Sequence, residues 1–460
     1  MDHIVLEGLE RSIVGRVIRP GDADFDDARR TFNSTVLRQP AAIVQPDDTG
    51  SVAATVRAAV AAGLPLTVRG GGHSVAGHAV ADGAVCVDLR RMRGVVVDPV
   101  ARRATVQGGA IWEDVDRATM PHDLAMTGGT FWDTGVGGLT LSGGLGYLMG
   151  TSGLTCDNLL RATVVTAAGD LVEAGPAGDP ELLWALRGGG GNFGIVTEFE
   201  FRLQPIGPMQ DGRFVVRLED AAAALVGAAA FVRDVPDEAM LYATGPTFEV
   251  APAAGEAPVG PADFLAFHVV YQGSPEAAEA ALAPIAALPG VHGGFETQTY
   301  EAIQIGSGSL PFGLRHYWKG HLVRDIDRTT AETIVAAMRS RPADPSFLLI
   351  ESLTGQSRLE PDGGAAFGQR EARWNVSAIA IWVDPADDAR QIAWARQVAD
   401  SIAPASYSGA GYANYASHDE SETRVRAAYG PERFARLQAV KRRYDPENLF
   451  RINHNIPPKP

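Results

Sequence analysis

The chain has 460 residues, of which 45% are hydrophobic and 21% are charged, and its formal net charge at pH 7 is −15. This composition excludes a disordered or fibrous protein and predicts more than one domain, because single cores rarely grow beyond about 250–300 residues. The negative charge argues against binding to nucleic acid or to anionic membranes, since both would be repelled.

Several features favour a cytoplasmic protein. Residues 1–18 mix charged and apolar side chains and lack the continuous apolar stretch of a signal peptide. The longest apolar tract, 221–232, is far shorter than the roughly 20 residues that a membrane-spanning helix needs. The two cysteines, Cys86 and Cys156, are compatible with that location.

The N-terminal part has a strand–helix–strand pattern with a glycine-rich loop. Capping residues and spaced valines predict a helix over 48–63. A strand at 64–68 leads into Arg69-Gly-Gly-Gly-His-Ser74, and a further strand is expected at 85–89, followed by a hairpin over 94–106. Because ligands bind at the carboxyl ends of strands in such folds, the 69–74 loop is a candidate ligand site.

Residues 127–153 form the most glycine-dense stretch of the chain. Glycine is entropically costly, so such a density indicates unusual turns or close approach of the main chain to a ligand. A strand is expected at 160–167, a helix begins at Asp179-Pro180, and another strand is expected at 195–203.

The pattern changes from about residue 212. Strands are expected at 214–218, 266–271, 347–352 and 376–383. They alternate with alanine-rich helical stretches, which favours an α+β region with an antiparallel sheet. Near the end, a strand is expected at 412–415, and a helix with Phe434, Leu437 and Val440 on one face follows it.

Several blocks of sequence, in order and at matching spacing, carry a resemblance to a known family. They are Arg69 to Ser74, Gly128 to Thr130, Thr134 to Gly138, Ser142 to Gly144, Gly153 to Asn158, Gly191 to Val196 and Tyr444 to Ile456. Over almost its whole length the chain resembles the berberine-bridge-enzyme-like flavoproteins of the vanillyl-alcohol-oxidase superfamily, including bacterial 6-hydroxynicotine-oxidase-like members. The competing interpretation, a Rossmann site, lacks the G-x-G-x-x-G motif with its following acidic residue.

The resemblance implies a fold and a cofactor. The fold is α+β, with a PCMH-type FAD-binding domain in residues 1–205 and a substrate-binding domain of antiparallel sheet backed by helices in 206–400. A berberine-type segment, 401–460, returns to the FAD domain. The cofactor is FAD, whose pyrophosphate is expected against the 69–74 loop and the 142–146 turn.

The resemblance also assigns positions to the cofactor site, and no metal is expected. The expected cofactor-binding residues are Arg69, Gly70, Gly71, Gly72, His73, Ser74, Gly129, Thr130, Thr134, Gly135, Gly138, Ser142, Gly143, Gly144, Gly146, Asn158, Gly194, Ile195, Val196 and Asn453. For Asn453 the alternative role is to cap a turn.

At His73 the resemblance implies a covalent bond to the flavin, formed when a neutral imidazole attacks the 8α-methyl position. The alternative is a histidine that only hydrogen-bonds within its loop. Some relatives add a second link through a cysteine where this chain has Phe131, so one link is expected, and Cys156 is interpreted as a small buried thiol. Thr134 occupies a position that controls access of oxygen to the flavin, and its small side chain favours oxidase behaviour.

For proton transfer the family places a tyrosine or a carboxylate over the flavin ring. The candidates here are Tyr412 and Tyr415, with Asn414 between them. In a strand, Tyr412 and Asn414 would share one face and Tyr415 would lie on the other. A tyrosine base needs its pKa, normally about 10, lowered by the oxidised flavin or a nearby cation. The candidate cations are Lys319, His321 and Arg370, and each is equally well explained as a paired or solvated residue.

The expected activity is that of an FAD-dependent oxidase. It would abstract a hydride from an alcohol or amine carbon, or catalyse oxidative cyclisation, with molecular oxygen regenerating the flavin and giving hydrogen peroxide. The alternatives are a flavin dehydrogenase with another electron acceptor and a non-catalytic flavoprotein that sequesters a flat hydrophobic compound. The expected partners are a small-molecule substrate and oxygen, and a homo-oligomer is left open.

Overall fold

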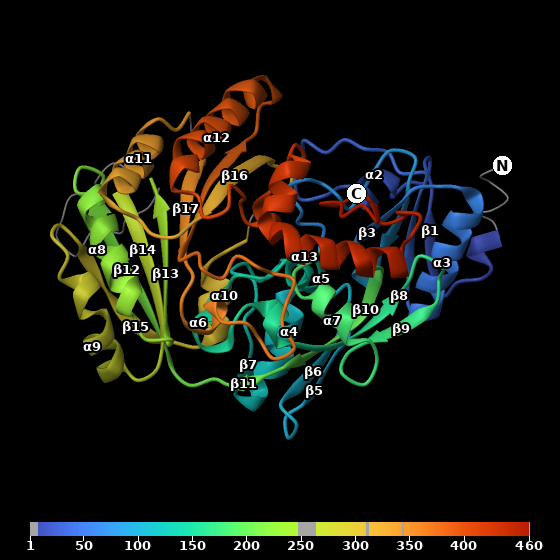
Figure 1. Cartoon of the computed structure of the whole chain (residues 1–460), viewed down its shortest axis with the longest axis horizontal. Helices are drawn as coiled ribbons and strands as arrows, with labels where there is room; N and C mark the ends of the chain where they lie inside the picture. The colour runs from blue at the N-terminus through green and yellow to red at the C-terminus, as the bar shows by residue number, and fades with distance from the viewer. Residues whose placement is uncertain (1–7, 247–263, 310–311, 343–344, 460) are drawn as a thin grey trace.

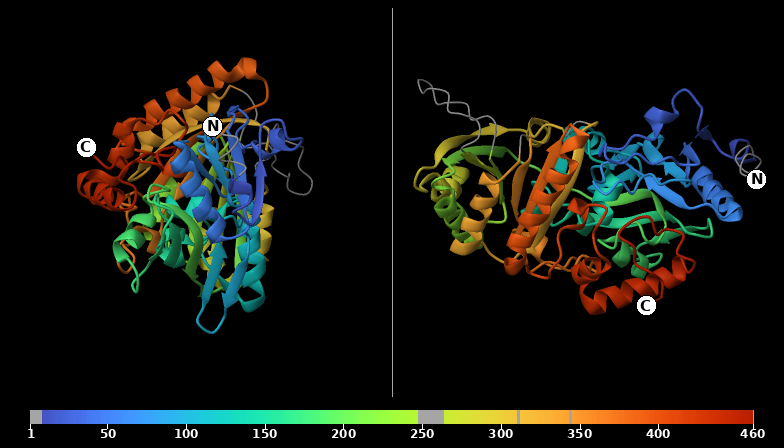
Figure 2. Two further views of the ribbon diagram at one scale, coloured as in Figure 1. Left: turned by 90° about the vertical axis from the view of Figure 1, so that its right-hand side faces the viewer. Right: turned by 90° about the horizontal axis from the view of Figure 1, so that it is seen from above.

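The computed structural model describes residues 8–246, 264–309, 312–342 and 345–459. Residues 1–7, on which part of the signal-peptide argument depends, lie outside these ranges. Two halves lie side by side along the long axis, a glycine-rich half and a half built on one large antiparallel sheet (Figures 1 and 2). The expected α+β fold class is confirmed, whereas the domain boundaries at 205 and 400 stay predictions.

The first sheet of the glycine-rich half has four strands, of which the last three in spatial order are parallel. These strands are, in spatial order, β1 (Gly15–Ile18), β2 (Ala42–Pro46), β4 (Val85–Asp88) and β3 (Leu66–Arg69). The predicted helix is α3 (Thr49–Ala62), which begins where the Asp48 side chain accepts a hydrogen bond from the Ser51 amide and ends at Gly63, whose φ is 65°. The carboxyl end of β3 therefore delivers the 69–74 loop to one edge of the sheet.

A second, antiparallel sheet of five strands completes this half. In spatial order its strands are β5 (Val95–Asp98), β6 (Arg103–Gln107), β10 (Ile195–Arg202), β8 (Leu159–Val165) and β9 (Leu171–Ala174). Alternation along β10 buries Phe199 and Phe201 in a core that helices cover. The shorter elements here are α2 (Phe25–Ala28), α4 (Trp112–Thr119), β7 (Leu124–Ala125), α5 (Val136–Leu141), α6 (Met149–Ser152), α7 (Pro180–Leu186) and β11 (Gln204–Pro205).

The other half is one antiparallel sheet of seven strands. In spatial order they are β15 (His292–Gln298), β12 (Met209–Arg217), β14 (Phe264–Gln272), β13 (Ala239–Gly245), β17 (Phe347–Ser352), β18 (Trp374–Trp382) and β16 (Arg315–Val323). One face is covered by the helices α8 (Ala221–Asp234), α9 (Pro275–Ala286), α11 (Arg328–Arg339) and α12 (Asp388–Ile402) (Figure 1). The opposite face is left for the site described below.

The chain then returns to the glycine-rich half through α13 (Glu422–Tyr444), which lies across it (Figure 1). The predicted apolar face is confirmed, since Phe434, Leu437 and Val440 are buried against that half. Earlier in the chain, α10 (Tyr300–Gly306) contributes Tyr300 and Ile303 to an apolar cluster with Met240 and Val270 of the sheet. Within the described ranges no helix combines the length and the apolarity that crossing a bilayer requires.

The predicted strand at 412–415 is wrong. Ala413–Tyr415 is a turn of 3-10 helix in which the Tyr415 amide donates to the Tyr412 carbonyl (3.0 Å). At three residues per turn, positions 412 and 415 share a side instead of lying on opposite faces, and the two rings meet edge to face at 5.0 Å. Both tyrosines therefore face the same region.

Candidate active site

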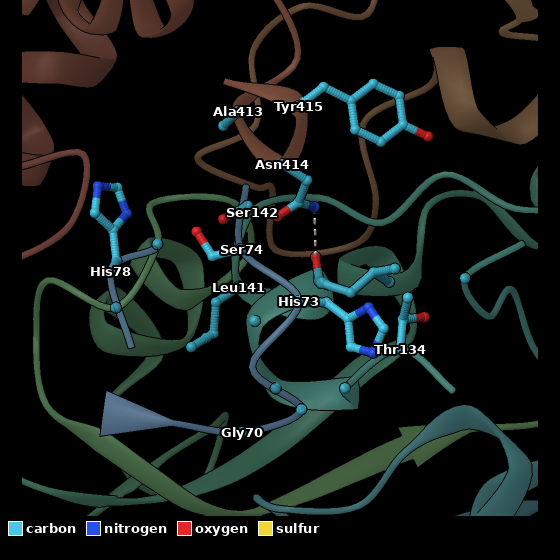
Figure 3. A pocket seen from close by; sticks show the side chains of 18 of the residues that line it. Gly70, His73, Ser74, His78, Thr134, Leu141, Ser142, Ala413, Asn414 and Tyr415 are labelled. Carbon is cyan, nitrogen blue, oxygen red and sulfur yellow. Dashed lines mark hydrogen bonds between the residues drawn. The ribbon is translucent and has the colours of Figure 1, made fainter. Parts of the chain in front are cut away.

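A cavity of about 460 Å³ lies between the glycine-rich segments and the uncovered face of the seven-stranded sheet. We call its two walls the floor, formed by segments 70–74, 129–142, 190–196 and 450–454, and the roof, formed by that sheet face. Figure 3 shows His73 and Thr134 next to each other on the floor, with Asn414 and Tyr415 above them. The cavity brings together residues more than 300 positions apart in the chain.

The floor is built largely from main chain. A methyl group on Gly71 would lie 2.5 Å from the Gly135 nitrogen, so two glycine segments approach too closely for any side chain. A methyl group on Gly138 or Gly191 would instead meet nothing within 4 Å. Both glycines line the cavity, so their missing side chains leave space that a bound group can fill.

Most of the predicted cofactor-binding positions line this cavity. They are Gly70, Gly71, Gly72, His73, Ser74, Gly129, Thr130, Thr134, Gly135, Gly138, Ser142, Gly194, Ile195, Val196 and Asn453. The Asn453 amide nitrogen is bonded to the Gly191 and Phe450 carbonyls, while its Oδ1 atom is buried without a partner among the described residues. An unpaired buried oxygen and the open glycines fit an extended polar cofactor such as FAD.

The remaining predicted positions support the floor from behind and do not line the cavity. Arg69 donates to the Ala28 carbonyl (2.7 Å), and Asn158 donates to the carbonyls of Ser152 and Leu154. Gly146 cannot carry a side chain, because a methyl group there would lie 1.8 Å from the Gly128 oxygen. The same holds for Gly143 and Gly144, which pack against Phe367 and Thr155.

His73 is a neutral imidazole at neutral pH. Burial, together with the charge of Arg69, lowers the pKa of this histidine to about 4. Its ring stacks on Phe32 at 5.1 Å and meets Phe312 edge to face at 5.1 Å. Its Nε2 atom lies 3.9 Å from the Asp133 carboxylate, whose own pKa burial raises to about 6. A neutral ring with its lone pair free is the form that can act as a nucleophile.

The roof carries a row of polar residues that the strand register aligns. Strand pairing places five polar residues next to one another, one on each of β12, β14, β13, β17 and β18. In that order they are Arg213, His268, Tyr242, Glu351 and Asn375. Directly paired residues of an antiparallel sheet point to the same face, so these side chains form one line. The first four of them line the cavity.

The next row along the same strands faces the other way. Phe214, Phe267, Ala243, Ile350 and Val376 are paired in the same manner, and all are buried under the helices. Adjacent residues of each strand therefore point to opposite faces of the sheet, one apolar and packed under the helices, the other polar and facing the cavity.

Glu351 is the most perturbed acid of the roof. It is fully buried, and burial raises its pKa to about 7 against the opposing effect of its two hydrogen-bond donors. Tyr415 Oη donates to one carboxylate oxygen (3.0 Å) and Asn375 Nδ2 donates to the other (2.7 Å). A carboxyl group that titrates near neutral pH inside a cavity is suited to accept a proton.

Tyr412 is held differently from Tyr415. Its hydroxyl oxygen accepts hydrogen bonds from the amides of Gly144 (2.9 Å) and Leu145 (3.2 Å) and from Asn414 Nδ2 (2.7 Å). These contacts tie the 412–415 turn to the glycine-rich segment. Burial raises the pKa of both tyrosines.

The three candidate cations of the sequence analysis are paired outside the cavity. Arg370 is buried in an ion pair with Asp157 (2.6 Å). Lys319 lies 3.6 Å from Glu420, and His321 is bonded to Ser406. None of the three lines the cavity, so the alternative interpretation, in which each is a paired residue, fits the structure, and lowering of a tyrosine pKa by the oxidised flavin stays a prediction.

The sequence analysis missed several lining residues. Glu351 ends a predicted strand, but its role depends on a register that the sequence alone does not fix. His78 and His454 meet edge to face at 4.9 Å at a part of the cavity away from His73 (Figure 3). Trp318 also lines the cavity, whereas Trp374 belongs to the core on the helix-covered side of the sheet.

Comparison with known proteins bears on this geometry. Residues 40–175 match the FAD binding domain family, and residues 411–457 match the family described as berberine and berberine like. The chain is 32% identical to (R)-6-hydroxynicotine oxidase of Paenarthrobacter nicotinovorans, over 97% of this chain and 98% of that protein. It is 30% identical to the FAD-linked oxidoreductase aurO of Gibberella zeae, over 94% and 83% of the two chains.

A solved structure agrees with the fold. The crystal structure of 6-hydroxy-D-nicotine oxidase from Arthrobacter nicotinovorans superimposes with a TM-score of 0.84 at 29% identity, over 97% of this chain and 99% of the other. Both the glycine-rich half and the seven-stranded sheet are included in that coverage. The chain therefore belongs to the berberine-bridge-enzyme-like family of FAD-linked oxidoreductases, and it is an FAD-dependent oxidase.

Proposed function

We propose that this oxidase holds FAD along the floor through a covalent bond to His73 and oxidises an alcohol or amine carbon of a small organic substrate. The observation that carries the proposal is that one cavity contains both a neutral buried imidazole, that of His73, and a buried carboxyl group, that of Glu351, whose pKa is about 7. Bound FAD supplies the hydride acceptor and transfers the electrons to oxygen, which leaves as hydrogen peroxide.

The floor residues hold the cofactor and His73 anchors it. Main-chain N–H groups of the glycine segments are free of side-chain obstruction and can bind phosphate oxygens. Because its pKa is about 4, His73 presents an unprotonated nitrogen at physiological pH. Its stacking on Phe32 fixes the ring plane, which favours a single bonding geometry.

Glu351 and Tyr415 move the substrate proton. Tyr415 remains a neutral phenol, since burial raises its pKa, and it already donates to Glu351. As it takes up the proton of a substrate hydroxyl or amine, its own proton passes to the Glu351 carboxylate. Tyr412 and Asn414, which we also predicted as catalytic, hold the turn that presents Tyr415.

The choice of oxidase over dehydrogenase is supported by the family and by Thr134. Its small side chain lines the cavity beside His73 and leaves room for oxygen (Figure 3). The 32% identical relative is named for oxidation of 6-hydroxynicotine, an amine, and this supports the amine side of the substrate class. A cytoplasmic location and a homo-oligomeric state stay predictions.

Acid denaturation tests the covalent bond directly. The purified protein is precipitated in acid, and the flavin colour is measured in the pellet and in the supernatant. We expect the colour to stay with the wild-type polypeptide and to be released in His73→Ala. His78→Ala is the matched control, because it removes a second cavity histidine and should leave the colour in the pellet. Release of the colour from the wild-type protein would contradict the bond.

A further inference from the structure

The roof contains a buried hydroxyl group that has no partner. Tyr242 is 5% exposed, lines the cavity, and its Oη atom has no hydrogen-bond partner among the described residues. An unpaired buried hydroxyl is destabilising, so its retention in a cavity indicates that something else pairs with it.

The polar groups around Tyr242 are already paired. Its ring meets Tyr147 edge to face at 5.2 Å, and the Tyr147 hydroxyl is bonded to Ser307. On the neighbouring strand, His268 Nε2 is bonded to Asp211 (2.6 Å), which Arg213 also binds through two nitrogens. None of these groups forms a hydrogen bond with the Tyr242 hydroxyl.

Glu351, the partner of Tyr242 on the other side, is also hydrogen-bonded to other residues. Both of its oxygens accept hydrogen bonds, from Tyr415 and Asn375. Directly opposed residues lie about 4.5–5.5 Å apart at Cβ, so a substrate that reaches the Glu351–Tyr415 pair passes beside Tyr242.

Beyond the polar row the roof becomes apolar. The next row facing the cavity has Thr244 and Leu349, and the row after it has Phe347, Ile379 and Trp318. Four residues separate 351 from 347, so this apolar stretch extends about 13 Å from the polar row. Trp318, which lines the cavity two rows from Tyr242, also has an Nε1 donor without a partner among the described residues.

This distribution matches one class of molecule. An oligosaccharide needs a hydrogen-bond partner for each buried hydroxyl, and the apolar rows offer it Thr244 and the Trp318 indole nitrogen. A flat ring system buries its faces against Leu349, Ile379 and Phe347 and needs a partner only for its substituents.

We propose that Tyr242 donates a hydrogen bond to an oxygen substituent of an aromatic or heteroaromatic ring, and that this contact selects oxygenated ring compounds over unsubstituted rings and over sugars. The assignment rests on the proposed function, because it names the substrate class of that site. Tyr242 remains a donor at every physiological pH, since burial and the Glu351 charge raise its pKa.

Equilibrium binding tests the assignment without requiring turnover. Holoenzyme is titrated anaerobically with two matched pairs, tyramine with phenethylamine and 5-hydroxyindole with indole, and with cellobiose, while the flavin absorbance change is recorded. We expect the hydroxylated member of at least one pair to bind about tenfold more tightly than its partner, as one hydrogen bond to a neutral group provides. Cellobiose should give no change.

Tyr242→Phe removes the hydroxyl and keeps the ring. We expect it to abolish the preference within that pair while the affinity for the unsubstituted ring changes less than about twofold. Tyr317→Phe is the control, since it removes a hydroxyl that binds Asp419 behind the sheet and should keep the preference. Unfolding temperatures of both variants show that each is folded.

Three results overturn the assignment: no binding of any ring compound, tighter binding of cellobiose, or a preference that survives in Tyr242→Phe. The proposed oxidation is judged separately, from the flavin reduction that follows binding. A preference that depends on Tyr242 without reduction of the flavin would uphold the substrate class and contradict the catalytic proposal.

Discussion

The two walls of the cavity are built on opposite principles. The floor is main chain, with glycine segments in contact at Gly71 and Gly135 and open at Gly138. The roof is side chain, with polar residues projecting from one face of a sheet. Where glycine segments touch, as at Gly71 and Gly135, a main-chain wall leaves no room for an added atom, whereas a side-chain wall can change at any position without altering the strands that carry it.

The largest expected effect, loss of the bound cofactor, comes from adding one carbon to the floor. Gly71→Ala places a methyl group 2.5 Å from the Gly135 nitrogen, so one main-chain segment must move. We expect the variant to be purified without FAD, or with a stability loss of about 1–3 kcal/mol from overpacking. Gly207→Ala is the control, since its methyl group meets nothing within 4 Å. FAD content and thermal unfolding measure both, and a fully loaded, stable Gly71→Ala would break the distinction between the walls.

Lys441 provides the next effect, because it fixes the floor from outside the cavity. Its buried Nζ atom donates to Asp445 (2.6 Å) and to the carbonyls of Asn192 (2.8 Å) and Phe450 (2.9 Å), two residues that line the cavity. Lys441→Met removes the cationic partner of the buried Asp445 carboxylate, which should lower the free energy of unfolding by about 3–5 kcal/mol.

Two further variants check the Lys441 explanation. The double variant with Asp445→Asn should recover part of the loss, because no buried charge is then left alone. Arg328→Met removes an exposed ion pair with Glu332 and should change the free energy of unfolding by less than about 0.5 kcal/mol. Equal losses in Lys441→Met and Arg328→Met would show that the buried pair does not hold the floor.

The floor could be predicted from sequence and the roof could not, for a physical reason. The resemblance locates the floor because its motif within 69–74 is continuous in sequence, and most of that motif lines the cavity. Glu351 becomes part of a polar row only through pairing with Tyr242, which is 109 positions earlier, and with Asn375. A strand that moved by one residue would turn Glu351 toward the helices.

The turn at 412–415 shows the same limit. Its aromatic residues favour a strand, yet Tyr412 anchors its hydroxyl on the amides of Gly144 and Leu145 and the chain closes a 3-10 turn instead. A contact between residues 268 positions apart thus overrides the local preference. The missed role of Glu351 and the wrong strand at 412–415 both lie in the C-terminal half, where the site depends on contacts between residues far apart in the chain.

The pH dependence of flavin reduction tests the roof. Glu351 accepts a proton only when ionised, and its pKa is about 7. Flavin reduction by a non-titrating alcohol substrate should therefore slow about tenfold per pH unit as the pH falls below 7 and level off above it. Glu351→Gln should lower the rate about 10²–10⁴-fold and flatten the profile. The infrared band of the protonated carboxyl, present at pH 5 and absent in Glu351→Gln, assigns the titration, and an unchanged profile in the variant would move the base elsewhere.

The smallest expected effect concerns the thiol beneath the floor. Cys156 is fully buried, does not line the cavity, and burial raises its pKa well above the usual range, so it stays a thiol instead of the reactive thiolate. Cys156→Ala should keep the flavin bound to the polypeptide in acid and lower the free energy of unfolding by about 1 kcal/mol, as removal of one buried heavy atom does. Cys86→Ala, at a second fully buried thiol, is the matched control. The contrary result is that His73→Ala still retains flavin in the acid pellet while the double variant with Cys156→Ala releases it. The floor would then hold the cofactor through two side chains, and the contrast between a main-chain wall with one anchor and a side-chain wall would fail.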